Sequence, residues 1–382
     1  MSKHAGSNAV EKTVLVVFPS IFSQNKVGIL EENIAKVLKA KGESFPRIRR
    51  DENLVIVEVP DPVLVSATLV SLFGIERIAI AREIENKFAL ALETIASTGR
   101  NLLLRGDRFY VKVEGRSSDY LAKDLEVAAT ASLIEKSSDL DVHPGSESSH
   151  TRLLYTYITN SHAYVCAFVD RGLGGIPYNS QGERMVCCIY DELSAVSCLQ
   201  AIKMGFDVIM VTVYSNDSDL LRASKMINRM LLSVVGPKVT LYFCKAQKMQ
   251  DLRTRILVGA QIATLVAKSK GIRHVGLPVP PFAFPARFIE ETSCLVSKKG
   301  LVPWLPLAGM DSSLIENAGQ LGLEKFLTSL GELCNTKLGK KAIPQKSVDS
   351  RAADTVKNLR QVSITIGSKN LYDMIDSLRT NH

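Results

Sequence analysis

The stretch R-M-V-C-C-I-Y-D-E-L-S-A-V-S, residues 184–197, decides the fold of the second half of the chain. Its apolar run at 185–189 predicts a short buried strand, and residues 194–204 predict a helix directly after it. In nucleotide-binding α/β domains the turn between such a strand and helix is rich in glycine and serine, because backbone N–H groups must approach the phosphates. Here the turn contains no glycine and two carboxylates, and it reads Tyr190, Asp191, Glu192, Leu193.

The residues after this turn repeat the order of strand and helix. The elements that periodicity predicts are strand 206–214, helix 217–234, strand 238–243, helix 250–269, strand 273–277 and helix 311–322. Repeated strand–helix units of this length favour a parallel, doubly wound sheet. The basic tail beyond residue 341 adds a predicted helix, 352–359, and a predicted strand, 362–366.

The residues before the turn alternate between strands and helices in a different way. The predicted elements are strand 13–19, helix 26–40, strand 53–59, helix 62–73, strand 75–84, helix 87–98, strand 108–114, helix 119–136 and a hairpin formed by 151–160 and 163–171. The first five fit a small ferredoxin-like α+β unit. The glycine-dense stretch G-L-G-G-I-P at 172–177 then marks the clearest domain boundary.

Length and composition favour a multidomain protein of the cytoplasm. A chain of 382 residues with 46% hydrophobic and 23% charged residues is typical of folded α/β proteins with two or three domains. The first twelve residues resemble no signal peptide, and no apolar run reaches the roughly 18 residues of a membrane span. The seven cysteines show no C-x-x-C spacing, so we expect no metal site. Five of them, including Cys187 and Cys188, are expected to be buried reduced thiols, whereas Cys294 and Cys334 stay open.

The net charge of +8 is distributed unevenly along the chain. Residues 1–175 hold 21 Lys and Arg against 22 Asp and Glu, whereas residues 176–382 hold 26 against 17. A basic excess suits a polyanionic partner through phosphate neutralisation, although many basic proteins bind no nucleic acid.

Four stretches together resemble the tRNA 4-thiouridine synthase family. They are D-R-G-L-G-G-I-P at 170–177, the strand–turn–helix register of 183–205 that ends in K-M-G, the element L-V-P-W-L-P-L-A-G-M-D-S-S-L-I-E-N-A-G-Q-L-G at 301–322, and Cys334. The resemblance implies a ferredoxin-like N-terminal domain (1–85), an RNA-binding THUMP domain (86–175) and a Rossmann-like PP-loop domain (176–340). A basic C-terminal extension (341–382) follows.

The chain departs from this family where the family binds ATP. The adenylating loop S-G-G-x-D-S of the family falls on 189–194, where only Ser194 agrees. A family arginine falls on Gln261, and a glycine-glutamate pair falls in the Pro-rich loop at 278–285. Tyr190 is expected to intrude on the phosphate space, and each carboxylate of the turn repels a phosphate by about 1 kcal/mol in water. The resemblance therefore implies a degenerate nucleotide site.

Each of these positions also has a purely structural interpretation. Asp191 and Glu192 suit a helix N-terminus, where carboxylates complement the dipole, and a metal or cationic-substrate site is the alternative. Phe282 and Phe284 of the Pro-rich loop suit a core better than a stacking surface. Cys334 falls where the family carries a sulfur-handling cysteine, but with no basic neighbour or second family cysteine an inert thiol is favoured.

RNA binding depends less on any single residue, because THUMP-type recognition relies on the shape and phosphates of a tRNA end. The candidate RNA-binding cations are Arg100, Arg105, Arg108, Lys112, Arg116 and Arg171. Each is otherwise a solvated surface charge, and the near-neutral total of residues 1–175 means that any basic patch is local.

Three functions follow from this reading. The first is a tRNA-binding protein related to 4-thiouridine synthases that needs no cofactor and presents tRNA to a sulfur donor or a tRNA-modifying partner. The second is an active tRNA sulfurtransferase that uses ATP and Mg²⁺ to activate uridine and a persulfide on Cys334 to thiolate it. The third is a protein–protein interaction module that uses the Pro-rich loop. Dimerisation through the C-terminal domain stays open.

Overall fold

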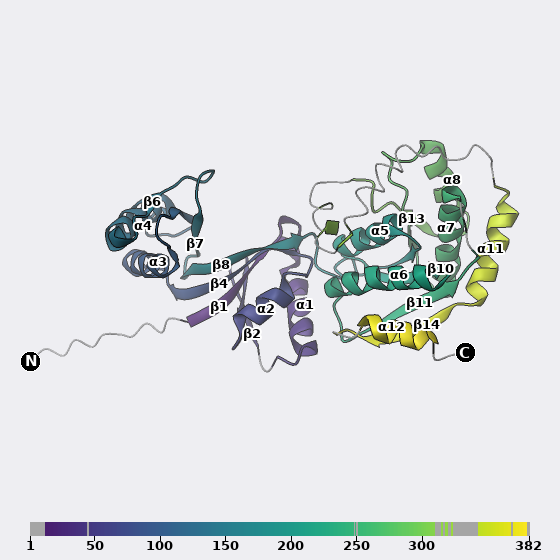
Figure 1. The fold of residues 1–382 in the computed structure, drawn as a ribbon, viewed down its shortest axis with the longest axis horizontal. Coiled ribbons are helices and arrows are strands. Elements are labelled where there is room, and N and C mark those ends of the chain that lie inside the picture. Colours follow the sequence, from purple (N-terminus) through teal and green to yellow (C-terminus); the bar gives the residue numbers. More distant parts are fainter. Residues whose placement is uncertain are drawn as a thin grey trace, which may run out of the picture. The chain divides into compact units, whose positions relative to one another are not determined.

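The computed structural model describes residues 12–43, 46–247, 249, 251–309, 315, 318–319, 322–323, 343–367 and 370–379. The contacts within the chain divide it into two compact units, shown in Figure 1. The first unit holds residues up to 27, 41–70 and 75–172, and the second holds 28–40, 71–74 and the residues from 173 onward. The main division therefore falls within the glycine-dense stretch 172–177.

The first unit is built on one eight-stranded sheet with the order β2-β3-β1-β4-β8-β7-β5-β6. Its strands are β1 (Lys12–Pro19), β2 (Arg47–Asp51), β3 (Leu54–Glu58), β4 (Ile75–Glu85), β5 (Arg108–Gly115), β6 (His143–Pro144), β7 (Arg152–Ile158) and β8 (His162–Gly174). Its helices are η1 (Ile21–Lys26), α2 (Pro62–Leu69), α3 (Phe88–Leu102), α4 (Ala122–Lys136) and η2 (Ser138–Leu140). The helix α1 (Val27–Ala40) lies among them in the chain but from Gly28 onward belongs to the second unit.

The strand β5 has one covered face and one partly exposed face. Phe109, Val111 and Val113 are buried, whereas the residues between them are partly exposed. The buried side chains pack with those of α3 and α4, such as Ile95 and Leu125, in one apolar cluster. Alternation with period two therefore places the charged residues of β5 on the opposite face of the sheet.

The second unit is a doubly wound α/β domain whose sheet has the order β13-β12-β9-β10-β11-β14. Its strands are β9 (Arg184–Ile189), β10 (Asp207–Tyr214), β11 (Lys238–Lys245), β12 (His274–Gly276), β13 (Val302–Trp304) and β14 (Arg360–Thr365). Its helices are α5 (Glu192–Lys203), α6 (Asp217–Met230), η3 (Leu231–Ser233), α7 (Leu252–Ser269), α8 (Ala286–Ser297), α11 (Gln345–Lys357) and α12 (Asn370–Arg379).

The strand order reverses beside β9. The chain runs from β9 outward to β10 and β11, and then returns to place β12 and β13 on the other side of β9. All of these pairs are parallel, and only the edge pair of β11 with β14 is antiparallel. In such sheets ligands bind at the carboxyl ends of the strands, close to the reversal.

Helices cover both faces of this second sheet (Figure 1). The helices α5, α6 and α12 pack with one another and with β9, β10 and β14, whereas α7 and α11 pack on the sheet from the other side and α8 packs on α7. The apolar side chains between these layers form one large core. The carboxyl edge of β9, β10 and β11 is thereby enclosed by helix ends from both layers.

The predicted α/β fold is confirmed, including the parallel order of the second sheet. The strand β2, the short strands β6 and β13 and the helices α8 and α12 were not predicted. The predicted helix 311–322 lies largely outside the described residues. One sheet runs through position 85, so the division of the first 175 residues into two modules stays a prediction. No helix among the described residues is long and apolar enough to cross a membrane.

Candidate functional site

The turn after β9 is closed by reciprocal hydrogen bonds between Asp191 and Ser194. Asp191 is the N-cap of α5, and its carboxylate accepts a hydrogen bond of 2.9 Å from the backbone N–H of Ser194. The Ser194 hydroxyl oxygen accepts hydrogen bonds of 2.9 Å from the backbone N–H groups of Tyr190 and Asp191. This capping box confirms the structural interpretation of the acidic turn. Glu192 lies in the first turn of α5, where a carboxylate complements the helix dipole.

The same hydrogen bonds decide how the turn responds to an anion. A phosphate turn holds its ligand through backbone N–H groups that have no other acceptor. In this turn the N–H groups of Tyr190, Asp191 and Ser194 all bond to side-chain oxygens of the turn itself. The carboxylate of Asp191 thus takes the place at the helix N-terminus that a phosphate would take.

The environment of Asp191 disfavours a second negative charge. Its side chain is only 13% exposed, and the carboxylate lies 3.7 Å from the guanidinium of Arg255 on α7. Burial raises the pKa of Asp191 above its ordinary value, and the hydrogen bonds with Ser194 and the charge of Arg255 partly offset that rise. The guanidinium that faces Asp191 is therefore already opposed by its carboxylate.

Tyr190 lies at the end of β9 and packs into the helix layer. A Cβ atom added to Gly259 of α7 would lie 2.5 Å from Cε1 of the tyrosine ring, so the ring sits directly on the glycine. The hydroxyl is buried without a hydrogen-bond partner among the described residues, and burial raises the pKa of Tyr190 well above its usual range. The ring therefore packs against α7, and Asp191 is the side chain that lies at the N-terminus of α5.

A pocket of about 350 Å³ lies beside this turn, at the carboxyl ends of β9, β10 and β11. Its polar lining includes Ser215, Asp219, Arg222 and Arg255. Arg222 lies 3.5 Å from Glu192 and 3.6 Å from Asp219, so the second guanidinium of the pocket also faces carboxylates. A pocket with balanced charge gives little attraction to a triphosphate.

The two other segments that depart from the family pattern lie in the second unit. Gln261 on α7 is buried, and its Oε1 atom has no hydrogen-bond partner among the described residues. In the Pro-rich loop Phe284 is 4% exposed and packs in the core, which confirms the role favoured for it. Phe282 is 50% exposed, so a core role is wrong for that residue.

The six candidate RNA-binding cations are spread over the first unit. Arg100 lies in the last turn of α3, Arg105 in the turn that follows and Arg108 at the start of β5, so these three lie near one end of that strand. Arg116 follows the other end, about 26 Å away for eight residues of strand. Arg171 is exposed on β8.

The candidates differ in how far acidic neighbours neutralise them. Arg100 forms an ion pair of 2.6 Å with Asp139. Lys112 projects from the open face of β5 and pairs with both Glu114 at 3.2 Å and Glu147 at 2.9 Å. Arg105 and Arg116 are exposed and form no ion pair within the described ranges, which makes them the strongest candidates for phosphate contacts.

Cys334 lies outside the described residues, so its role as a sulfur carrier stays a prediction. Sequence reasoning missed Arg222 and Arg255. Asp251 caps α7 and accepts from the N–H of Thr254, which places Arg255 four residues into the helix, a spacing visible in the sequence. That Arg255 faces Asp191 depends on how α7 packs against β9, which no local pattern gives.

No family model matches this sequence. Among curated proteins, a probable tRNA sulfurtransferase of Thermococcus kodakarensis is 25% identical over 326 residues, which cover 78% of this chain and 83% of that protein. A probable tRNA sulfurtransferase of Methanosarcina mazei is 26% identical over 196 residues, or 50% of this chain and 47% of that protein. The chain is therefore related in sequence to the tRNA sulfurtransferases.

Two solved structures share the fold. The crystal structure of PH1313 from Pyrococcus horikoshii superposes with a TM-score of 0.61 and 19% identity over 81% of this chain and 99% of that one. The structure of a 4-thiouridine synthetase–RNA complex with bound ATP superposes with a TM-score of 0.63 and 13% identity over 93% of this chain and all of that one. The resemblance found in the sequence thus extends to the fold of both units.

Proposed function

We propose that this relative of the tRNA sulfurtransferases is a cytoplasmic tRNA-binding protein that does not adenylate its RNA. The relationship in sequence and fold supports tRNA as the ligand, since the structural neighbour is a complex with RNA. In this role the protein presents tRNA to a separate enzyme or sulfur donor. A thiolation reaction on this chain itself is the competing function.

The observation that carries the proposal is the closed turn between β9 and α5. Adenylation requires the turn to hold the phosphates of ATP through its backbone N–H groups. Here the carboxylate of Asp191 and the hydroxyl of Ser194 accept from those groups. A phosphate at 4–5 Å from Asp191 is repelled by about 1 kcal/mol in water and by more where the turn is dry, which counts against ATP binding at the turn.

The RNA surface that we propose lies on the first unit, at the two ends of β5. Arg105 and Arg108 lie at one end and Arg116 lies at the other, all exposed. A separation of about 26 Å spans several successive phosphates of an RNA backbone. Contacts of this kind give affinity that depends steeply on salt and little on sequence.

The test is the salt dependence of tRNA binding by the full chain, measured on filters with bulk tRNA. Each cation that contacts a phosphate contributes about one unit to the slope of log K against log salt. We expect Arg105→Glu and Arg116→Glu each to lower both the affinity and this slope. Arg287→Glu is the matched control, because Arg287 is an exposed arginine on α8 in the second unit.

Equal effects of all three substitutions would contradict the proposed surface, since the first unit would then contribute no more than general charge. Absence of tRNA binding at low salt by a folded protein would contradict the proposed function itself.

A further inference from the structure

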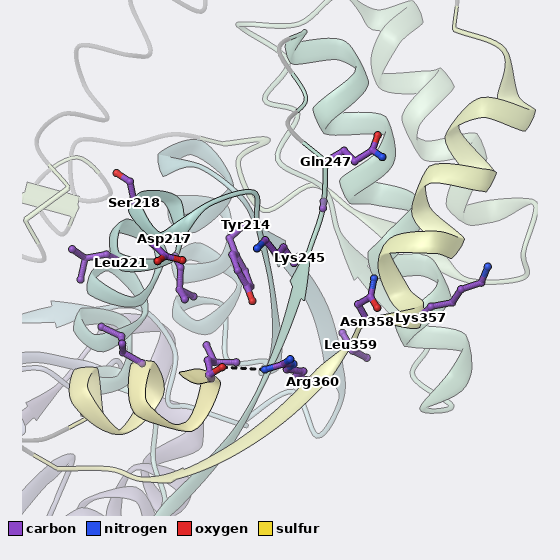
Figure 2. A pocket seen from close by; sticks show the side chains of 14 residues that line it. Tyr214, Asp217, Ser218, Leu221, Lys245, Gln247, Lys357, Asn358, Leu359 and Arg360 are labelled. Carbon is purple, nitrogen blue, oxygen red and sulfur yellow. Dashed lines mark hydrogen bonds between the residues drawn. The ribbon is translucent and has the colours of Figure 1, made fainter. Parts of the chain in front are cut away.

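A second and larger cavity, of about 1090 Å³, lies at the outer part of the carboxyl edge of the second sheet. It is bounded by the ends of β10 and β11, the first turns of α6, the start of β14 and one side of α12, as Figure 2 shows. The strand β14 and helix α12 belong to the basic C-terminal part of the chain. This cavity shares Tyr214, Ala246 and Gln247 with the small pocket. Tyr190, Arg222 and Arg255 line the small pocket alone, so the large cavity adjoins the closed turn without including it.

The strand register places three polar side chains on one face at this edge. Tyr214 of β10 is paired with Lys245 of β11, so the two side chains point to the same side of the sheet. Arg360 of β14 is paired with Phe243, two residues before Lys245, which places Arg360 on that side as well. The three side chains line the cavity together with residues of α6 and α12.

The cavity has more basic groups than its acidic groups balance. Lys245 is exposed and forms no ion pair within the described part of the chain. Arg360 donates one hydrogen bond, of 3.0 Å, to the carbonyl oxygen of Leu378 at the end of α12 (Figure 2). A guanidinium has five N–H donors, so four have no acceptor among the described residues and are available to a ligand. Lys357 adds a further cation at the rim but is paired with Asp354 at 2.9 Å.

Tyr214 lies between the charges of the cavity. Burial raises the pKa of this half-buried phenol, the positive charge of Arg360 lowers it, and the negative charge of Asp217 raises it. Arg360 and Asp217 are therefore both close enough to act on the same hydroxyl. A planar ring with a cation on one side and a carboxylate on the other offers separate contacts for different parts of one molecule.

Most of the remaining lining is apolar and comes from Leu220, Leu221, Ala246, Leu359, Ile375 and Leu378. Ser218, Gln247 and Asn358 are its uncharged polar members. Apolar walls that face a tyrosine ring favour a flat aromatic group, whereas Lys245 and Arg360 favour a phosphate. A nucleotide joins a flat aromatic ring to a phosphate through a sugar with free hydroxyl groups. The volume of about 1090 Å³ slightly exceeds the roughly 300–1,000 Å³ typical of small-molecule sites, so it has room for such a group.

We propose that this cavity binds a nucleotide, with its base against Tyr214 and the leucine walls, its phosphate on Lys245 and Arg360, and a ribose hydroxyl donating to Asp217. The nucleotide is either free in solution or the end of an RNA strand. The site is separate from the turn at Asp191, and it does not depend on the tRNA surface of the first unit.

The test is calorimetric titration of the full chain with AMP, with adenosine and ribose 5-phosphate as the two halves of that probe. AMP should bind more tightly than either half. Replacing Lys245 with alanine removes one charged contact of roughly 1.5–3 kcal/mol, so AMP binding should weaken about tenfold or more. Lys245 is exposed at a strand end, so this variant should fold. Lys225→Ala, an exposed lysine of α6 outside the cavity, is the matched control and should bind AMP normally.

Two further arms locate the site and identify the source of the nucleotide. Arg222→Ala alters the small pocket beside Asp191 and should leave AMP binding unchanged. A 5′-phosphorylated RNA tetranucleotide that displaces AMP and binds more tightly identifies an RNA end, and failure to displace AMP identifies a free nucleotide.

Three results would overturn the proposal. The first is no AMP binding at millimolar concentration, the second is AMP binding that Lys245→Ala leaves intact, and the third is AMP binding that Arg222→Ala alone removes. Because tRNA binding is measured separately, either proposal can fail while the other stands.

Discussion

At the scale of single residues, Asp191 caps the N-terminus of helix α5 and, in our proposal, also keeps anions away from it. Its carboxylate accepts from the backbone N–H of Ser194, and the Ser194 hydroxyl accepts from two further N–H groups. A buried carboxylate whose pKa is raised by burial is a costly cap, and Arg255 at 3.7 Å offsets part of that cost. The capping of α5 alone is a sufficient structural reason for an aspartate at this position, without a bound ligand.

Asp191→Ala should therefore destabilise the protein by about 1 kcal/mol, because an N-cap is lost and the N–H of Ser194 has no acceptor. Asp191→Asn keeps an acceptor oxygen at the cap, so its loss of stability should be smaller. Urea unfolding at pH 7 measures both. If the two variants were equally destabilised, the charge of Asp191 and its pairing with Arg255 would matter more than the cap.

The sequence predicts the role of Asp191 well, since an acidic residue before an apolar helix is a strong local signal. It predicts less well where the Tyr190 side chain points. The sequence predicts a ring that intrudes on the phosphate space, whereas the ring packs on Gly259, which lies 69 positions further along the chain. The missing side chain of that glycine creates the space, and only the packing of α7 on β9 brings the two residues together.

At the scale of elements, the clearest polar network of the first unit joins the end of β2 to the turn after β7 and to β8. Asp51 accepts hydrogen bonds from Tyr164 at 2.5 Å and Thr159 at 2.8 Å, and it faces His162 at 3.2 Å. Burial alone would raise the pKa of Asp51, but these hydrogen bonds and the His162 charge hold it below its ordinary value. This network ties the end of the charged strand β2 to the hairpin of β7 and β8.

The pH dependence of stability follows from the sign of that shift. A carboxyl whose folded-state pKa is lowered stabilises the fold above its unfolded-state pKa, and it loses that contribution as the pH falls through the folded value. Tyr164→Phe removes the donor at 2.5 Å, so it should lower stability by about 1–3 kcal/mol at pH 7 and move acid unfolding to higher pH. The loss should begin to shrink below about pH 4, where aspartates of the unfolded chain become protonated, and it should vanish once the pH is below the lowered folded-state pKa of Asp51.

Tyr157→Phe is the matched control for this experiment. Tyr157 pairs with Tyr164 across the two strands, and its hydroxyl forms no hydrogen bond within the described ranges. Removing it should cost little at any pH. A Tyr164→Phe variant whose loss of stability is the same at pH 7 and pH 3.5 would show that the tyrosine acts by packing and not through Asp51.

Elements with regular periodicity were predictable from the sequence, and elements stabilised by distant charges were not. The strand β2 reads R-I-R-R-D and has no apolar alternation. Its Arg49 forms ion pairs with Glu58 on β3 and Glu83 on β4, which the local sequence cannot show. The helix α8 begins directly after the Pro-rich loop, and the prolines before it made a loop the expected structure of this segment. The edge strand β14 was predicted, but its antiparallel pairing with β11 was not.

At the scale of the whole molecule, the two units carry different charges and, in our account, different contacts. The near-neutral N-terminal half presents local cations at the ends of β5, whereas the basic excess of the C-terminal half includes Lys245 and Arg360 of the large cavity. The relationship to the tRNA sulfurtransferases covers both halves. The chain therefore shares the fold of a 4-thiouridine synthetase, and in our proposal its turn between β9 and α5 does not use ATP.

The measurement that tests this account most directly is formation of AMP from labelled Mg-ATP, with bulk tRNA and a sulfide source present. It follows ATP consumption and not ATP binding, so nucleotide held in the large cavity does not affect it. The same preparation must bind tRNA in the same buffer, which serves as the control for folding. We predict that AMP forms no faster than without protein, with or without tRNA. AMP that accumulates only when protein and tRNA are both present would contradict the account and establish an active sulfurtransferase, with Cys334 as the next residue to replace.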